Sequence, residues 1–126
     1  MARKPSDIQW LPEHEDHHYP AALSYLELSL EPTRARALVR ALRKAPVASF
    51  MAKDIFRASG LSLLGISNSQ VEKNRKKILM GKPLAPVLLV RDPGRGRVVI
   101  ADGYHRVCAV YTFDEDALIP CKIVTL

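Results

Sequence analysis

The stretch over residues 97–113 constrains the fold of this chain more than any other. An apolar run over residues 98–101, preceded by Arg97, is followed by Asp102 and Gly103, and then by a mostly apolar segment over residues 104–113. Short apolar runs rich in β-branched residues are typical of buried strands, and a glycine before a longer apolar segment marks a turn. The sequence therefore predicts a strand that turns at Gly103 directly into a helix.

Three further segments complete a small predicted sheet. Residues 86–90 form a continuous apolar run, which is typical of an interior strand covered on both faces. Residues 92–96 are rich in turn formers, so this strand should pair with residues 97–101. Residues 119–124 predict the last strand and residues 47–51 a short first one. The chain is therefore predicted to be α+β, with a small mixed sheet and packed helices.

Residues 1–45 are predicted to form an N-terminal arm and a helical extension. Residues 1–19 are polar and predict a loose arm that docks on the body through a few apolar side chains, namely Ile8, Trp10 and Leu11. Tyr19-Pro20 and Glu31-Pro32 each begin a helix, because proline is tolerated at the first helical position. The expected apolar stripes are Leu23, Leu26 and Leu30 in the first helix, and Ala35, Leu38, Val39 and Leu42 in the second. The arginines of the second helix are interpreted as a solvated face, with a phosphate-binding face as the alternative.

A short helix and an apolar loop are expected after the first strand. Asp54 can cap a helix that Gly60 ends. The apolar loop over residues 61–66 is expected to fold under the core. Both features would extend the hydrophobic core beyond the sheet.

A basic helix is expected over residues 69–80. Asn68 or Ser69 can cap it, and Gly81 closes it. Its apolar positions are few, whereas basic residues dominate: Lys73, Arg75, Lys76 and Lys77. Such a helix lies on the surface with one thin apolar stripe turned inward.

Three histidines and three carboxylates stand together over residues 13–18. Such a cluster can bind a divalent metal ion. The spacing matches no standard metal motif, however, and the segment has no periodicity that would aim its side chains. We therefore expect a solvated loop, predict no metal site, and leave the role of His14, His17 and His18 open.

Composition narrows the class of protein. A chain of 126 residues with 48% hydrophobic content fits one compact unit and argues against general disorder. The net charge of +6 permits anionic partners, a nucleotide or nucleic acid, without selecting one. Cys108 and Cys121 lie in apolar runs and are expected to be core thiols. No signal peptide and no apolar run of about 18 residues is visible, so we expect a cytoplasmic chain with no membrane span. Whether the chain binds a protein partner or forms a homo-oligomer is left open.

The turn at Gly103 has the chemistry of an anion site. A helix start leaves backbone N–H groups without intrahelical partners and carries the positive end of the helix dipole. Gly103 lets an anion approach closely, while His105 and Arg106 add side-chain donors. Asp102 can orient Arg106 or His105, cap the helix, or help to hold a magnesium ion. The alternative is a structural turn in which Arg106 pairs with Asp102.

This turn and its setting resemble the ParB/sulfiredoxin-like superfamily. The resemblance rests on the order of a strand, the motif Asp102-Gly103-Tyr104-His105-Arg106, an apolar helix and a closing strand. The basic helix followed by residues 84–90 is similar to the segment before the paired strands in that family. The resemblance covers roughly residues 47–126, and we assign residues 46–126 to a ParB/sulfiredoxin-like domain. It implies a nucleotide, ATP or CTP with Mg²⁺, held by Gly103, Tyr104, His105 and Arg106, with further contacts from Lys73 and Lys77.

The chain also departs from members of that family. Sulfiredoxin has a nucleophilic cysteine where Tyr104 stands, and Cys108 lies one helical turn further on and is expected to face the core, so sulfinic acid reduction is not expected. Partition proteins of the ParB type carry a helix-turn-helix domain after this fold. Because this chain ends at Leu126, centromere binding is not expected either. No carboxylate pair matches that of the serine kinases in the family.

Three functions follow from these observations. The first is a nucleotide-binding module that regulates or binds a partner. The second is a phosphotransferase or nucleotide hydrolase, in which Asp102 acts as the metal or base residue while His105 and Arg106 stabilise phosphate charge. The third is a non-specific nucleic-acid binder that uses the basic stretches over residues 34–44 and 73–82, although the scarcity of aromatic residues there weakens a stacking mode.

Overall fold

The structure, a computed structural model, describes residues 8–63 and 68–126. Its elements follow in chain order: α1 (His18–Leu26), α2 (Pro32–Lys44), β1 (Ala48–Met51), α3 (Ala52–Ser59), α4 (Ser69–Leu79), β2 (Val87–Asp92), β3 (Arg97–Asp102), α5 (Tyr104–Phe113) and β4 (Leu118–Thr125). The predicted α+β class is confirmed. The predicted junction at Gly103 is confirmed as well, because β3 ends at Asp102 and α5 begins at Tyr104.

The four strands form one mixed sheet in the order β1-β4-β2-β3. The β2–β3 hairpin is antiparallel, as the turn chemistry predicted, and β1 is antiparallel to β4. The central pair, β2 and β4, is parallel. A parallel pair needs a long crossover connection, and here β3 and α5 lie between the two strands in the chain.

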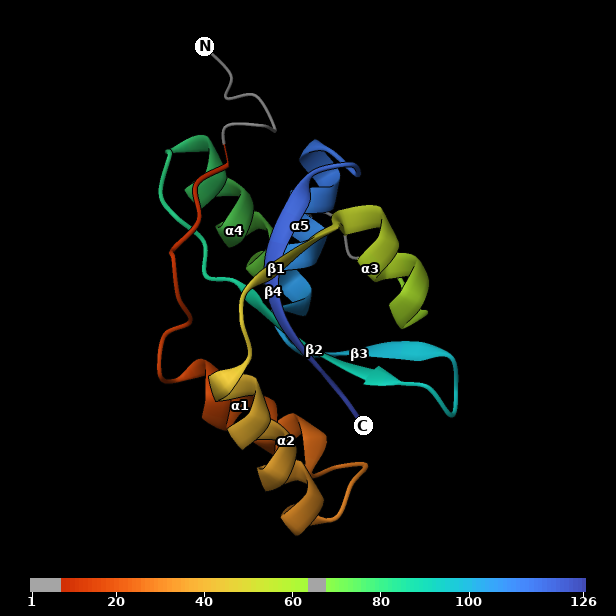
Figure 1. The fold of residues 1–126 in the computed structure, drawn as a ribbon. Helices are drawn as coiled ribbons and strands as arrows, with labels where there is room; N and C mark the ends of the chain where they lie inside the picture. The colour runs from red at the N-terminus through yellow and green to blue at the C-terminus, as the bar shows by residue number, and fades with distance from the viewer. Residues whose placement is uncertain (1–7, 64–67) are drawn as a thin grey trace.

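Helices cover the sheet on both faces, and this explains the continuous apolar run of β2. Val87 and Leu89 belong to a core with α3, α4 and α5, whereas Leu88 and Val90 belong to a second core with α1 and α2. Successive side chains of a strand point to opposite faces, so a strand between two cores must be apolar at every position. Figure 1 shows α1 and α2 gathered apart from α3, α4 and α5.

A buried lysine joins the arm and α2 to the sheet. The Nζ atom of Lys122 on β4 donates to the Tyr19 hydroxyl at 3.2 Å and to the Arg43 carbonyl at 3.0 Å. It also lies 2.9 Å from Oε1 of Glu13. Burial works against the charge, but Glu13 and Tyr19 outweigh burial and raise the pKa of Lys122. The ammonium group therefore stays charged and holds residue 13 against the body.

The arm is docked rather than loose over the residues described. The Leu11 N–H donates to the Leu84 carbonyl at 2.8 Å, and the Leu84 N–H donates to the Gln9 carbonyl at 2.9 Å. Ile8 and Trp10 pack against the first core, as expected. The expectation of a solvated loop over residues 13–18 is wrong for His14 and His18, which are only 7% and 6% exposed. Local sequence could not reveal this, because the burial comes from tertiary contacts.

Two expectations near α3 are also wrong. The helix begins at Ala52, and Asp54 lies in its first turn instead of capping it. The N–H groups of Ala52 and Lys53 donate to the carbonyls of Ala117 and Glu115, so backbone from the α5–β4 connection replaces a side-chain cap. Leu61 and Leu63 are exposed rather than folded under the core, and the rest of that predicted loop, residues 64–67, lies outside the described residues.

The remaining composition-based expectations concern the thiols and the membrane. Cys108 and Cys121 are both buried, which confirms the expected core thiols. Burial raises the pKa of Cys121 to about 12, so this thiol is no nucleophile at neutral pH. Among the described helices, none has the length and apolar character needed to cross a bilayer.

Candidate functional site

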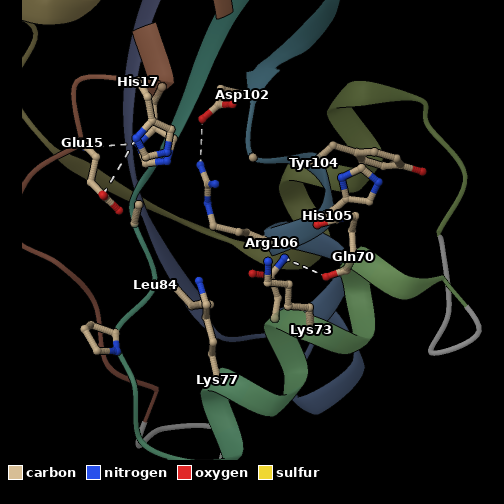
Figure 2. Close-up of a pocket in the computed structure, with 15 residues that line it drawn as sticks. Glu15, His17, Gln70, Lys73, Lys77, Leu84, Asp102, Tyr104, His105 and Arg106 are labelled. Atoms are coloured by element: carbon tan, nitrogen blue, oxygen red, sulfur yellow. Dashed lines mark hydrogen bonds and ion pairs between the residues drawn. The ribbon is translucent and has the colours of Figure 1, made fainter. Parts of the chain in front are cut away.

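A cavity of about 440 Å³ lies between α4, the start of α5 and the N-terminal arm (Figure 2). All seven residues predicted for the site line it: Lys73, Lys77, Asp102, Gly103, Tyr104, His105 and Arg106. Residues 83–85 complete the wall. The structure thus brings together groups that are about thirty positions apart in the chain.

The arm contributes residues that sequence reasoning did not place here. Glu15, His17 and His18 line the cavity, and α4 adds Gln70 and Asn74. The histidine cluster was visible in the sequence. Nothing in its spacing linked it to the turn at Gly103, because α2, β1, α3, α4, β2 and β3 lie between them in the chain.

Gly103 holds a backbone conformation that other residues rarely adopt. Its φ of 108° lies in the left-handed region. A Cβ atom placed there would lie 2.8 Å from Cγ2 of Val87 and 2.8 Å from Nη2 of Arg106. Glycine is therefore required both for the direction of the turn and for the packing beneath it.

The first turn of α5 places backbone N–H groups without intrahelical partners beside the cavity. The N–H of Val107 donates to the Gly103 carbonyl at 3.0 Å and closes the first turn of the helix. The N–H groups of Tyr104, His105 and Arg106 precede that bond and have no partner within the helix. Within the described residues no side chain caps α5, whereas Asn68 accepts from two N–H groups at the start of α4. The positive end of the α5 dipole therefore faces the cavity.

Arg106 is anchored by its neighbours. Its Nη2 atom donates to Oδ2 of Asp102 at 2.9 Å and to the Pro86 carbonyl at 3.1 Å (Figure 2). The two side chains are only 15% and 16% exposed. The ion pair occupies the carboxylate of Asp102 and holds the guanidinium against the cavity wall. This is the pairing that the sequence left as the structural alternative.

Lys73 and Lys77 supply positive charges that are exposed to solvent. They are exposed, four residues apart on α4, and lie on the side of that helix near Arg106 (Figure 2). Arg75 fixes α4 in this place, because its guanidinium donates to Oγ1 of Thr112 and stacks 4.5 Å from the centre of the Phe113 ring. Lys76, exposed on the same helix, lies outside the described lining of the cavity.

The Tyr104 side chain has a structural contact of its own. Its hydroxyl donates to the Ser62 carbonyl, and its ring meets the Phe56 ring edge-on at 6.5 Å. Burial and the neighbouring Cys108 raise the pKa of Tyr104, so the phenol stays neutral. Tyr104 therefore offers the cavity its backbone N–H more readily than its hydroxyl.

The histidines of the arm differ in their surroundings. The backbone N–H of Glu15 donates to Nδ1 of His18 at 3.1 Å. The pKa of His18 is lowered by burial and then by the positive charge of Arg106, although Asp102 and Glu15 oppose that shift. His17 is exposed, with its Nδ1 3.9 Å from Oε2 of Glu15. His14 is buried beside the His18 and Tyr19 rings.

His14 makes the stability of the fold depend on pH. Its ring nitrogens have no hydrogen-bond partner of normal geometry among the described residues, and burial lowers its pKa to about 4 against the opposing effect of the Val87 backbone. Below pH 6.5 the unfolded chain therefore binds a proton that the folded chain rejects. We expect the free energy of unfolding to fall by about 2 kcal/mol through His14 between pH 7.5 and pH 5.

Urea denaturation at several pH values measures this loss. The variant His14→Leu should flatten the pH dependence by that amount. An equal slope for wild type and His14→Leu would contradict the assignment.

Comparisons with protein-family models, with curated proteins and with solved structures found no match to this chain. The resemblance described above therefore stays a prediction. The chemistry of the cavity rests on the groups that line it.

Proposed function

We propose that this chain is a ParB/sulfiredoxin-like domain whose cavity binds the phosphates of a nucleotide, ATP or CTP with Mg²⁺, and that it acts as a regulatory or partner-binding module. One observation carries the proposal. Six residues predicted to bind nucleotide phosphates line a single cavity with Asp102, the predicted catalytic residue, and with the uncapped first turn of a helix. Backbone N–H groups at a helix start are a recurrent phosphate site in proteins.

The charges around the cavity favour an anion. Asp102 and Arg106 neutralise each other through their ion pair. Glu15 is then the one acidic residue of the described lining that offsets the positive charges of Lys73 and Lys77. The positive end of the α5 dipole adds to the positive potential of the cavity. A phosphate can receive hydrogen bonds from both lysines and from the N–H groups of the turn, and hydrogen bonds to charged groups are the stronger ones.

The dimensions favour a ligand larger than a single phosphate. A volume of about 440 Å³ lies within the ordinary range for small-molecule and cofactor sites. Pro83 is exposed and adds a small apolar surface on which a base or sugar can pack, whereas Leu84 and Ala85 are buried behind it. A nucleoside polyphosphate has both kinds of surface, one anionic end and one flat, largely apolar end.

The position of Asp102 favours binding over catalysis. Oδ2 of Asp102 is engaged by Arg106, and a reaction that takes this oxygen away from the pair would leave a buried guanidinium without its partner, which is costly. The phosphotransferase and hydrolase hypotheses therefore gain no support from the geometry. The arginines of α2 lie outside the described lining of the cavity, so a nucleic acid bound by them would occupy a separate surface.

A thermal-shift panel tests the proposal. The protein is melted with ATP, ADP, CTP or GTP at millimolar concentration, each with and without Mg²⁺, and with a short DNA duplex. A ligand present at 100 times its dissociation constant stabilises the folded state by about 2.7 kcal/mol, which raises the melting temperature by several degrees. We expect that rise with at least one triphosphate. No rise with any nucleotide would refute the proposal, and a rise with duplex alone would favour nucleic-acid binding.

A further inference from the structure

We infer that the N-terminal arm forms part of the binding site, and that His18 donates a hydrogen bond from its Nε2 atom to the ligand held by α4 and α5. This inference rests on the proposed function, because it concerns the same ligand. It adds a third wall to the site from residues that lie outside the part of the chain that resembles the ParB/sulfiredoxin-like family.

The arm is fixed well enough to act as a wall. On one side of the histidines, residues 9 and 11 form backbone hydrogen bonds of 2.9 and 2.8 Å with Leu84, which itself lines the cavity. Glu13 meets the buried ammonium of Lys122 at 2.9 Å. On the other side the chain continues directly into α1, which packs in the second core. Figure 2 shows His17 across the cavity from Lys73 and Lys77.

The backbone of Glu15 determines which nitrogen of His18 carries the hydrogen. A backbone N–H can only donate, and this one donates to Nδ1 of His18 at 3.1 Å. Nδ1 must therefore keep its lone pair, so the neutral ring carries its hydrogen on Nε2. Although His18 is buried, it lines the cavity. The ring thus offers the ligand a donor in a fixed orientation.

Burial and the charged groups around His18 together lower its pKa and favour the neutral ring. Arg106 from α5 and His17 from the arm disfavour the protonated ring, whereas Asp102 from β3 and Glu15 from the arm favour it. Burial is the largest influence and lowers the pKa. A bound phosphate would add negative charge beside the ring and strengthen the hydrogen bond from Nε2.

The same cluster has the composition of a metal site, but its geometry fits an anion better. Ligand atoms of Glu15, His17 and His18 lie within 4.8 Å of one another. A tetrahedral ion with bonds of 2.0–2.2 Å needs its ligands about 3.4 Å apart, and Nδ1 of His17 is already 3.9 Å from Oε2 of Glu15. In addition, Nδ1 of His18 is engaged by the Glu15 N–H, and Nε2 bears the hydrogen. A cation would have to break this bond, whereas a phosphate oxygen would not.

Two substitutions at residue 18 separate the donor from the local structure. In His18→Asn the side-chain oxygen can still accept from the Glu15 N–H, but the shorter side chain has no donor at the position of Nε2. In His18→Gln the side-chain amide can place a donor near the position of Nε2. We expect His18→Asn to weaken binding of the best triphosphate of the panel, measured by isothermal titration calorimetry with Mg²⁺, by about tenfold or more. His18→Gln should retain most of the affinity, and the melting temperatures of both unliganded variants show whether they fold.

The outcomes distinguish this inference from the proposed function. Absence of binding by the wild type overturns both. If the wild type binds nucleotide, Lys73→Gln binds it more weakly and His18→Asn binds it as tightly as the wild type, the role of the arm is overturned and the proposed function stands. Saturable binding of Zn²⁺ at micromolar concentration that is lost in His17→Gln also overturns it, because the cluster would then be a metal site.

Discussion

Replacing Gly103 by alanine lowers the free energy of unfolding by an expected 2–4 kcal/mol, about 3 kcal/mol as the central value. Two costs add. The φ of 108° is strained for any residue with a Cβ atom, and the new methyl group would lie 2.8 Å from Cγ2 of Val87. Val87 is fully buried between the sheet and its helices, so it has no free space into which to move.

Two other glycines provide matched controls for this effect, which urea denaturation followed by circular dichroism measures. Gly96 has a φ of 64° but no atom within 4 Å of an added Cβ, so Gly96→Ala isolates the backbone cost. Gly94 has an ordinary φ, and its nearest atom, Oδ1 of Asp92, is 3.6 Å away, so Gly94→Ala should change stability by less than about 0.5 kcal/mol. A smaller loss for Gly103→Ala than for Gly96→Ala would contradict the crowding at the turn.

Replacing Lys73 and Lys77 together by glutamine should weaken triphosphate binding by about 100-fold, since each charge-assisted hydrogen bond contributes about 1.5–3 kcal/mol. Both lysines are exposed, so stability should not change. The control is Lys76→Gln, which removes one positive charge, against two in the double variant, from the same helix outside the described lining of the cavity. Calorimetric titration measures all three proteins. Equal losses in the control and the double variant would mean that only the overall charge matters.

Arg106 is a poorer choice for this experiment, although it is the residue that the sequence favours. Its guanidinium pairs with Asp102 and the Pro86 carbonyl. Removing it would leave a partly buried carboxylate without a partner, so a loss of binding would be mixed with a loss of stability. The exposed lysines separate the two effects.

The sheet and the junction at Gly103 could be predicted because local sequence dictates them. The apolar run of β2 indicates burial on both faces, and the glycine after β3 indicates the turn. Lys73 and Lys77 could be assigned to the site only through the resemblance to a family. These residues meet the turn at Gly103 because α4 packs against α5. Local sequence does not specify this tertiary contact.

The arm could not be predicted in the same way. His14 and His18 are buried by contacts with distant parts of the chain, and polar residues without periodicity indicate a loop when only their neighbours are considered. The start of α3 was also missed, because backbone carbonyls at residues 115 and 117 satisfy its first N–H groups where a capping side chain was expected. In both places the deciding partner is remote in sequence.

Backbone amide resonances report on the proposed site most directly. In a titration of the ¹⁵N-labelled protein with ATP or CTP and Mg²⁺, we expect saturable shifts of the amide signals of Gly103, Tyr104, His105 and Arg106, because their N–H groups would bind the phosphates. Signals from α2 should stay in place and serve as the internal control. Saturable shifts confined to α2, or no shifts at millimolar nucleotide, would contradict phosphate binding at the start of α5.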